Sequence, residues 1–512
     1  MSRQASSNRT ANLRWQNLHE NVKLTVGEYH ELWNPMPPRS TRIPEDVRAT
    51  TSYVCSIIAD AAARGKTIRS VGGAWSLSEV ATSKDIMLGT RNLNLWFPLA
   101  MGFLDAPTNH DVKRIHYMQC GSSVGEVYSR LEKRNLTLPT SGASNGQTIA
   151  GAVSTGTHGS AFTYGAIQEC VVGIHLITGS NPATDSILLE RASDPVASQS
   201  LARRLGARIV RDDDQFNAAL VSFGSMGFVM GYIINAEPIY HLESWRRVVP
   251  YDGLVKALMT TLDVDLVPMI VPSLPVHADK IWHVEVVLNP HDPANAYLTI
   301  MERWDTNRRL SAPEPVDTSA PGDDLLSVIG GLTAALPSSA GTATSTLLNL
   351  TFGDRGPVVA TPYGTFTAPT VRGSALSAEI GVPYDRSVDA VELLMSCPEI
   401  KKYAGIIACR FVKASSALLA FTQFPVTCTI ELPGVKNANT QHFYDAAYAR
   451  LFASDIPVTA HWGQIYPIGD KILSAYGPNL HRWLAAREAL LSAEMRSVFG
   501  HQSTPRGVTP GD

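Results

Sequence analysis

What this sequence lacks excludes several classes of protein. Its 512 residues carry a net charge of −3, so no basic excess is available for nucleic acid or an anionic membrane. No stretch approaches the roughly 18–20 apolar residues of a membrane span. The first 16 residues have no apolar segment of the secretory type, and their weak amphipathic character does not favour a transit peptide.

Cysteine pairs of the metal-binding or redox-active kind are also missing. The six cysteines are scattered without any C-x-x-C pair, at positions 55, 120, 170, 397, 409 and 428. The sequence therefore predicts neither a zinc site, nor any other metal site, nor a redox dithiol. A reduced, cytoplasmic protein is the simplest interpretation of this cysteine usage.

Small residues are abundant between positions 138 and 161, LPTSGASNGQTIAGAVSTGTHGSA. Such a run favours neither a core helix nor a core strand, because glycine destabilises both unless the backbone turns tightly or approaches another group closely. It suits backbone that wraps a large polar ligand, with amides aimed at phosphates or ring carbonyls. An ordinary glycine-rich loop is the alternative.

Residues 67–78, TIRSVGGAWSLS, form a second candidate for ligand binding. A short buried strand at 68–71 runs into a turn of small residues, which is a common way to present backbone amides to a pyrophosphate. Neither G-x-G-x-x-G nor G-x-x-x-x-G-K-[ST] occurs there, so a Rossmann unit and a P-loop are both disfavoured.

With two later motifs, these segments resemble the vanillyl-alcohol-oxidase-type (PCMH-type) FAD-linked oxidoreductases. Residues 71–76 are similar to the family's pyrophosphate loop, V-G-x-G-H-S, and residues 147–159 to its Q-T-[IV]-A-G-A-x-x-x-G-T-H-G segment. Residues 223–238, FGSMGFVMGYIINAEP, are similar to a strand-turn-strand of the family, and residues 460–463 stand near its C-terminal H-W-G-K. The branch that this chain resembles is that of the sugar-acid lactone and alditol oxidases.

The resemblance implies an α+β fold with a two-subdomain FAD-binding domain, an antiparallel-sheet substrate (cap) domain and a C-terminal segment that returns to the FAD domain. We expect a lead-in at 1–37, the FAD-binding domain at 38–240, the cap at 241–450 and the C-terminal segment at 451–512. Apolar periodicity predicts helices at 47–64, 124–134, 212–223 and 481–499, and strands at 68–71, 86–88, 116–119, 171–176, 245–250, 282–288, 406–412 and 427–432. Residues 311–345 are predicted to form a long loop or lid.

The resemblance also implies which residues bind FAD. The expected set is Val71, Gly72, Gly73, Ala74, Trp75, Ser76, Gly142, Ala143, Gln147, Thr148, Gly151, Ala152, Thr155, Thr157, His158, Gly159, Ala161, Gly227, Val229 and His461. Among these, His158 is expected to be a structural residue of the cofactor shell rather than a base, because it lies in a tight glycine turn.

Position 75 departs from the family pattern. Related oxidases commonly carry a His there that is joined to the flavin, and indole is not such a nucleophile. Residues 142–144 offer no Cys for a second link, so we expect FAD to be non-covalent, with Trp75 against the ring edge. A core tryptophan without cofactor contact is the alternative.

Gly142 bears on the electron acceptor. In related flavoproteins a small residue near this place leaves a path for oxygen, so glycine favours an oxidase over a dehydrogenase. A glycine required only by its backbone conformation is an equal alternative.

Two residues are candidates for catalysis. By resemblance, Arg410 stabilises negative charge on flavin or substrate, and a surface arginine on an edge strand is the alternative. His461 is the candidate base, since imidazole titrates near neutral pH, and a histidine that only shapes the pocket is the alternative. Ala408 and Gln464 replace the family's Glu and Lys, which predicts a less polar site.

The resemblance implies an oxidase. It would transfer hydride from a C–H(OH) or related carbon of a small molecule to FAD, and dioxygen would reoxidise the flavin to give hydrogen peroxide. The alternatives are a dehydrogenase that uses a protein or quinone acceptor, and a non-redox or degenerate flavin-binding scaffold or cyclase.

Overall fold

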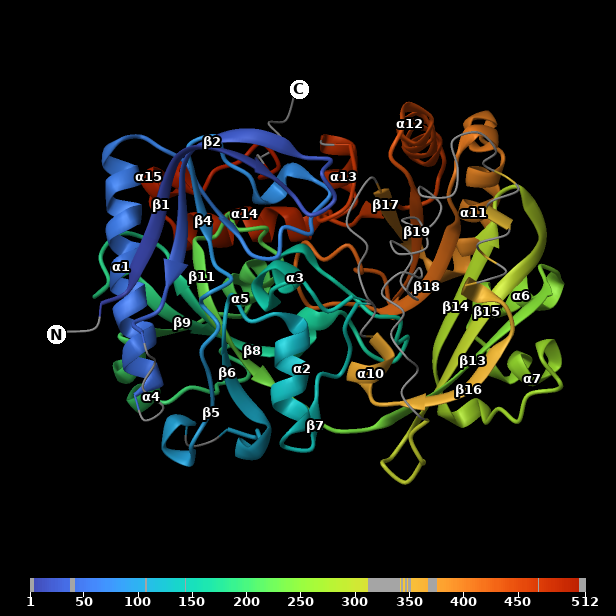
Figure 1. Ribbon diagram of the computed structural model, residues 1–512, viewed down its shortest axis with the longest axis horizontal. Coiled ribbons are helices and arrows are strands. Elements are labelled where there is room, and N and C mark those ends of the chain that lie inside the picture. Colours follow the sequence, from blue (N-terminus) through green and yellow to red (C-terminus); the bar gives the residue numbers. More distant parts are fainter. Residues whose placement is uncertain are drawn as a thin grey trace.

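In the computed structural model, four sheets and their helices form two halves that lie side by side (Figure 1). One half holds sheets of four, six and two strands, and the other holds an eight-stranded antiparallel sheet. The expected α+β architecture is thereby confirmed. The structure describes residues 4–36, 42–105, 108–142, 144–311, 341, 344–345, 348, 351–366, 375–467 and 469–505. Most of the predicted lid at 311–345 therefore lies outside the described residues.

The N-terminal residues are not the extended lead-in that the sequence predicted. Strands β1 (Ser6–Gln16) and β2 (Lys23–Trp33) form an antiparallel hairpin. Strand β2 then pairs in parallel with β4 (Ile86–Gly89), which pairs with β3 (Ile68–Val71). Nearly all of β1 is exposed or half-buried, so its sequence has no apolar period that would identify a strand.

The six-stranded sheet forms the centre of the same half. Its order is β10-β9-β8-β11-β6-β5, with β12 and β7 as a separate pair. The strands are β5 (Trp96–Pro98), β6 (Ile115–Gln119), β7 (Leu136–Thr137), β8 (Val171–Ile177), β9 (Ser186–Glu190), β10 (Arg208–Arg211), β11 (Phe228–Asn235) and β12 (Glu237–Pro238). Its helices are α1 (Ile43–Ala63), α2 (Val124–Glu132), α3 (Ile149–Thr155), α4 (Gln199–Leu205) and α5 (Asp213–Leu220). The capping box of Ser123 and Glu126 that begins α2 is present.

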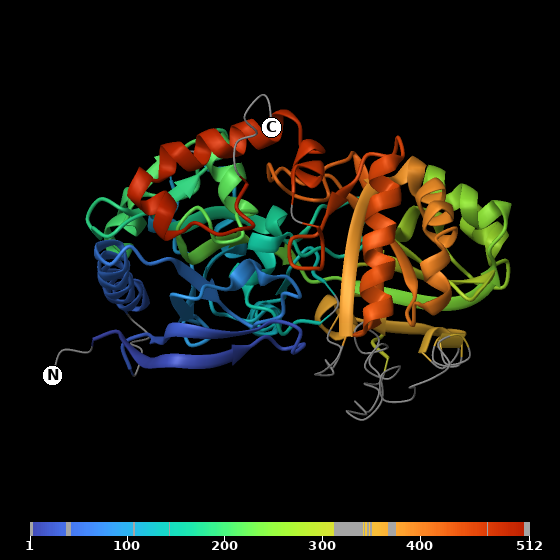
Figure 2. The same cartoon turned by 90° about the horizontal axis from the view of Figure 1, so that it is seen from above.

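The second half is built on the order β16-β13-β15-β14-β18-β19-β17-β20. The strands are β13 (His241–Pro250), β14 (Ile281–Asn289), β15 (Asp292–Trp304), β16 (Arg355–Ala360), β17 (Ala375–Pro383), β18 (Ile407–Lys413), β19 (Val426–Val435) and β20 (Thr459–Ala460). Helices α6 (Gly253–Thr261), α11 (Ser387–Met395) and α12 (Ala438–Ala453) cover its outer face, and α7 (Val267–Ile270) and α10 (Pro362–Phe366) lie at its edge (Figure 2). The other face turns toward the first half, since Glu285 and Arg410 of this sheet line a cavity together with Ser141 and His158.

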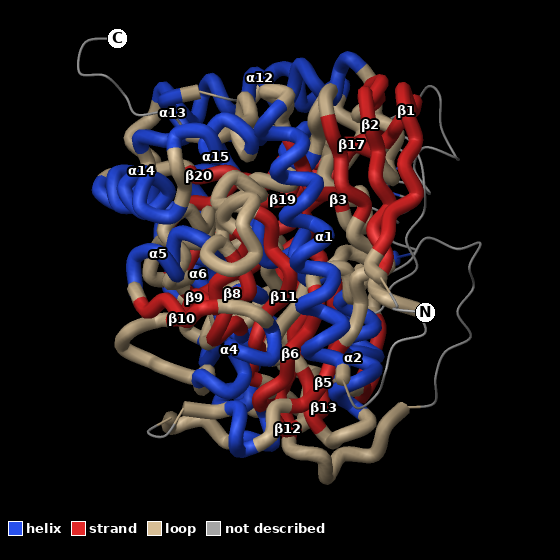
Figure 3. Tube along the Cα trace, turned by 90° about the vertical axis from the view of Figure 1, so that its left-hand side faces the viewer, coloured by secondary structure: helices blue, strands red, loops and turns tan. Residues whose placement is uncertain are grey.

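The C-terminal segment returns to the first half, as expected. It forms α13 (Asp470–Ser474), α14 (Pro478–Leu490) and α15 (Ala493–Val498), so the single helix predicted at 481–499 is wrong. Ser492 interrupts it, because its side chain caps α15 by accepting from the Met495 amide. Figure 3 shows α14 and the β1–β2 hairpin at opposite edges of this half.

None of the helices that the structure describes combines the length and the apolar character needed to span a bilayer.

Candidate active site

The loop after β3 presents backbone amides toward a large cavity. The N–H groups of residues 73–76 donate to no acceptor within the described part of the chain. Ala74 has a φ of 58°, which lies in the left-handed region. A residue in this conformation turns successive amides toward one side and forms an anion-binding concavity. The loop is therefore suited to a phosphate group.

A short helix forms the facing wall. Helix α3 begins at Thr148, whose hydroxyl accepts the Gly151 amide at 3.3 Å. A Cβ on Gly72 would stand 2.0 Å from Thr148 Oγ1, so glycine is required where the two walls touch. The segment is thus partly a buried core helix, against expectation, because Ile149 and Val153 supply its apolar face.

Trp75 lies between these walls and lines the cavity. A Cβ on Gly146 would come within 2.5 Å of the indole, so the ring rests directly on that glycine. Behind it, the His19 ring of the N-terminal hairpin packs edge-on, with ring centroids 5.9 Å apart. The hairpin turn also holds the loop, since the Leu18 amide donates to the Ala74 carbonyl at 2.8 Å.

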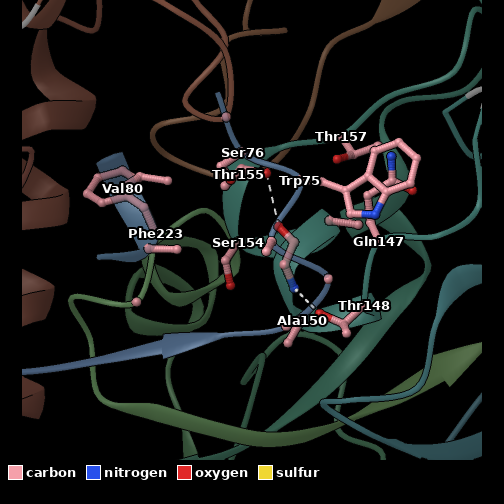
Figure 4. A pocket seen from close by; sticks show the side chains of 18 of the residues that line it. Trp75, Ser76, Val80, Gln147, Thr148, Ala150, Ser154, Thr155, Thr157 and Phe223 are labelled. Carbon is pink, nitrogen blue, oxygen red and sulfur yellow. Dashed lines mark hydrogen bonds between the residues drawn. The ribbon is translucent and has the colours of Figure 1, made fainter. Parts of the chain in front are cut away.

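The cavity encloses about 1490 Å³ of empty space, its open mouth included. Figure 4 shows Trp75, Gln147 and Thr157 on one side of it, and Val80 and Phe223 on the other. The structure brings together here nearly all residues that the sequence proposed: Val71, Gly72, Gly73, Ala74, Trp75, Ser76, Gly142, Gln147, Thr148, Gly151, Ala152, Thr155, Thr157, His158, Gly227, Val229, Arg410 and His461.

Three of the proposed residues are not at this cavity. Gly159 lines a second cavity instead. Ala161 was expected at the cofactor but lies elsewhere. It is buried in an apolar cluster with Tyr240 and Leu242, and its backbone forms a β-bridge with that of His283. Ala143 lies outside the described residues.

Arg410 stands at the inner end of the cavity. Its strand β18 lies between β14 and β19, so this is no edge-strand arginine. The guanidinium donates to Glu285 Oε1 at 2.9 Å and to Glu431 Oε2 at 2.7 Å, and Glu379 Oε1 is 3.9 Å away. Burial disfavours its charge, but these carboxylates raise the pKa of Arg410 above its ordinary value. The cation is therefore permanent and fixed in direction.

His158 bridges the two halves. One ring nitrogen lies 2.6 Å from the Gly159 carbonyl and the other 2.7 Å from Glu379 Oε1. Burial alone would raise the pKa of Glu379, but His158, His461 and Arg410 lower it to about 2. The His158 ring thus connects the Gly159 carbonyl of the first half to Glu379 of the large sheet.

His461 has a different protonation. The Gly463 amide donates to its Nδ1 at 3.0 Å, which leaves the proton on Nε2. Burial lowers the pKa of His461 to about 4, so the ring is neutral. In this tautomer the free ring position is a donor, and the residue is suited to donate a hydrogen bond rather than to accept a proton.

Comparison with known proteins identifies the ligand of the first half. A family model described as "FAD binding domain" matches residues 47–181. This chain carries an FAD-binding domain. The match confirms the resemblance to the vanillyl-alcohol-oxidase-type flavoproteins that the four motifs indicated.

The chain is also similar to curated proteins and to solved structures. D-arabinono-1,4-lactone oxidase of Candida glabrata is 23% identical over 209 residues, which are 41% of this chain and 34% of that protein. L-gulono-1,4-lactone dehydrogenase of Mycobacterium tuberculosis is 24% identical over 42% of this chain and 44% of that protein. The chain thus aligns with less than half the length of either relative. Cholesterol oxidase from B. sterolicum shares the fold, with a TM-score of 0.63, 12% identity, and coverage of 96% of this chain and 97% of that one.

The first cavity fits FAD. The amides of residues 73–76, which have no acceptor in the described part of the chain, match a pyrophosphate. A partly apolar lining with a few polar groups, as found here, is typical of cofactor sites. FAD would therefore be held between the loop after β3 and the 142–158 wall.

A second cavity continues from the FAD site. His158 and Arg410 line both, and the second encloses about 1030 Å³, its mouth included. Its floor comes from one face of the large sheet, where Arg246, Thr299, Glu285 and Arg410 stand in one row across four strands. This row is polar throughout.

The sequence interpretation missed most of these polar residues. Glu285, Glu379, Glu431 and His283 each lie in an otherwise apolar strand, and an isolated charged residue in such a strand was the available signal. Glu431 faces Ala408 directly across β18 and β19, so a carboxylate stands beside the place where Ala408 replaces the family's Glu.

Proposed function

We propose that the protein is an FAD-dependent oxidoreductase that oxidises a C–H(OH) carbon of a small hydroxylated molecule. The observation that carries this proposal is the meeting of two cavities at Arg410 and His158. The first cavity has the amides and the space for FAD, and the second has polar side chains for a substrate. A substrate carbon bound at their junction would lie beside the flavin.

Each side chain at the junction has a distinct task. FAD, when bound, supplies a two-electron acceptor. Arg410 is a fixed cation that stabilises negative charge developing on the substrate oxygen or the ring. His461 donates from Nε2 and orients an oxygen acceptor. His158 holds Glu379 in place through the hydrogen bond between them.

The lining of the second cavity supports a polar substrate. His283 is buried, and neither of its ring nitrogens has a partner in the described structure. Burial lowers its pKa to about 4, so the neutral ring offers one donor and one acceptor, which matches a hydroxyl group. The names of the relatives make a sugar-acid lactone the first substrate to test. A sterol would leave these polar groups unpaired, at about 1–3 kcal/mol each.

The proposed electron acceptor is dioxygen, with hydrogen peroxide as the product. Gly142 supports it, because its φ is not in the left-handed region, so backbone conformation alone does not require glycine there. One relative is named a dehydrogenase, and a protein or quinone acceptor is therefore the second candidate.

We also propose that FAD is bound without a covalent link, in a reduced compartment such as the cytoplasm. Trp75 stands at the position where the resemblance places a linking His, and indole is not such a nucleophile. Cys120 lines the cavity, but burial raises the pKa of its thiol to about 12, so it is no nucleophile at neutral pH. All six cysteines are free.

The test is the visible spectrum of the purified protein, followed by acid precipitation and anaerobic mixing with lactones. We expect yellow protein, flavin in the supernatant, bleaching by a sugar-acid lactone and recovery in air. Flavin in the pellet would contradict non-covalent binding. Bleaching that only a dye or quinone reverses would favour the dehydrogenase. A protein that takes up no FAD, or a flavin that no substrate bleaches, would favour the degenerate scaffold or cyclase.

A further inference from the structure

Two carboxylates face each other at the inner end of the FAD cavity. Glu379 of β17 and Glu431 of β19 are direct partners in the antiparallel register, and both line the cavity. Their exposed fractions are only 3% and 6%. Like charges directly opposite each other in a sheet are destabilising, and burial strengthens the repulsion. Such a pair therefore favours a state in which one member holds a proton.

The cations around the pair are divided unequally. Glu379 has the His158 ring nitrogen at 2.7 Å. Glu431 has only Arg410, at 2.7 Å, and that guanidinium is shared with Glu285 at 2.9 Å. Arg410 thus serves three carboxylates, since Glu379 Oε1 is also 3.9 Å from it, and Glu431 shares its cation with the other two.

The hydrogen bonds of Glu431 also permit a proton. Its Oε2 accepts from Arg410, whereas its Oε1 faces the Ser377 hydroxyl at 3.3 Å. A hydroxyl rotates, so Ser377 can donate to the carboxylate or accept from the carboxylic acid. No such freedom exists at Glu379 Oε1, which His158 holds.

We propose that Glu431 is the group that accepts the hydroxyl proton of the substrate. The inference rests on the proposed oxidation. In that step the O–H proton passes to the Glu431 carboxylate, the C–H hydrogen leaves with its electron pair to the flavin, and a C=O bond forms. The proton count balances, because Glu431 releases the proton to solvent after the product leaves.

The burial and the charged neighbours of Glu431 determine the direction in which its pKa is shifted. The charged and titratable groups that act on it from the neighbouring elements are Glu379, Arg410, Glu285, His158, Tyr403 and Tyr444. Burial raises the pKa of Glu431, Arg410 opposes this, and Glu379 adds to it, so that the pKa lies above its ordinary value. A base whose pKa is raised toward the working pH is the more effective one.

The experiment compares Glu431→Gln with Glu431→Asp and with Glu285→Gln, which removes the other carboxylate hydrogen-bonded to Arg410. Anaerobic flavin reduction by the active lactone is followed against pH. We expect the wild-type rate to fall as pH is lowered through the titration of Glu431. Glu431→Gln should lower the rate about 10²–10⁴-fold and lose this acid limb. Glu431→Asp should restore part of both, and Glu285→Gln should keep the limb at a lower rate.

A second readout needs no turnover. In the full-length protein labelled with ¹³C-glutamate, infrared spectroscopy should show a protonated carboxyl band that grows with the midpoint of the kinetic limb. The band should be missing in Glu431→Gln and present in Glu285→Gln. An unchanged band in Glu431→Gln, or an acid limb that persists there, would overturn the assignment. If no lactone or other hydroxy substrate bleaches the wild-type flavin at any pH, the oxidation itself is wrong, whatever the infrared titration shows.

Discussion

The two cavities of this protein are built by different means. The FAD cavity is made largely of backbone and small residues from two continuous stretches, 71–77 and 142–158. The second cavity is made of side chains from strands far apart in the sequence: Glu285 lies beside Arg410, although the two are 125 positions apart along the chain. The first fixes a cofactor by the shape of the chain, and the second fixes a reaction by charges. Substitutions should therefore act on them separately.

The largest effect is expected at the charged cavity. Arg410→Ala should cut flavin reduction by about 10²-fold or more, because it removes the fixed cation. The visible spectrum should show FAD still bound, since the amides of residues 73–76 are untouched. Arg410→Lys tests geometry, because lysine keeps the charge but cannot hold two carboxylates in a fork.

Arg482→Ala is the matched control, as this exposed arginine forms an ion pair with Asp214 and a hydrogen bond with Asn479 on the outside of the FAD half. If Arg410→Ala reduces its flavin at a rate within a few-fold of the parent, Arg410 takes no part in the reaction.

A substitution in the FAD cavity should instead weaken the binding of the cofactor. Gly72→Ala would place a Cβ against Thr148 and push the two walls apart. Overpacking of this kind costs about 1–3 kcal/mol, so we expect FAD to bind about 10- to 100-fold more weakly. Titration of the flavin-free protein with FAD measures this. Gly253→Ala is the control, because nothing lies within 4 Å of its added Cβ. Equal affinity in both variants would show that the walls are not rigid.

Acid should destabilise both regions. Burial lowers the pKa of His19, His116, His283 and His461 to about 4. Between the ordinary value of about 6.5 and about 4, the unfolded chain binds protons that the folded chain excludes, so the unfolding free energy falls as the pH falls through this window.

Denaturant unfolding of the flavin-free protein should show a slope steeper than the ~1.4 kcal/mol per pH unit of a single proton. His283→Leu should reduce that slope, whereas replacement of the exposed His442 is the control. A flat profile would mean that these buried rings are not neutral.

Most of the residues that the sequence proposed for FAD line one cavity, and their signals are local. A turn of small residues after a strand, as at 72–74, can be recognised in the sequence without knowledge of the fold. The charged cavity was largely invisible, because it depends on register: Glu431 lies beside Ala408 only once β18 and β19 are paired. Arg410 was found through resemblance, whereas its partners were not. The tautomer of His461 also depends on a hydrogen bond from the Gly463 amide, and no sequence pattern predicts that bond.

The smallest effect concerns the border between the cavities. Gly142 lines the FAD cavity, and an added Cβ would stand 3.0 Å from Thr157 Cγ2. If this place is the path of oxygen, Gly142→Ala should slow reoxidation of the reduced flavin several-fold in stopped-flow mixing with air, without changing its reduction. Thr157→Ser in the same chain removes the methyl that the new Cβ meets. Reoxidation that stays slow in the double variant would assign the block to the alanine itself, recovery would assign it to displaced packing, and an unchanged single variant would exclude an oxygen path at Gly142.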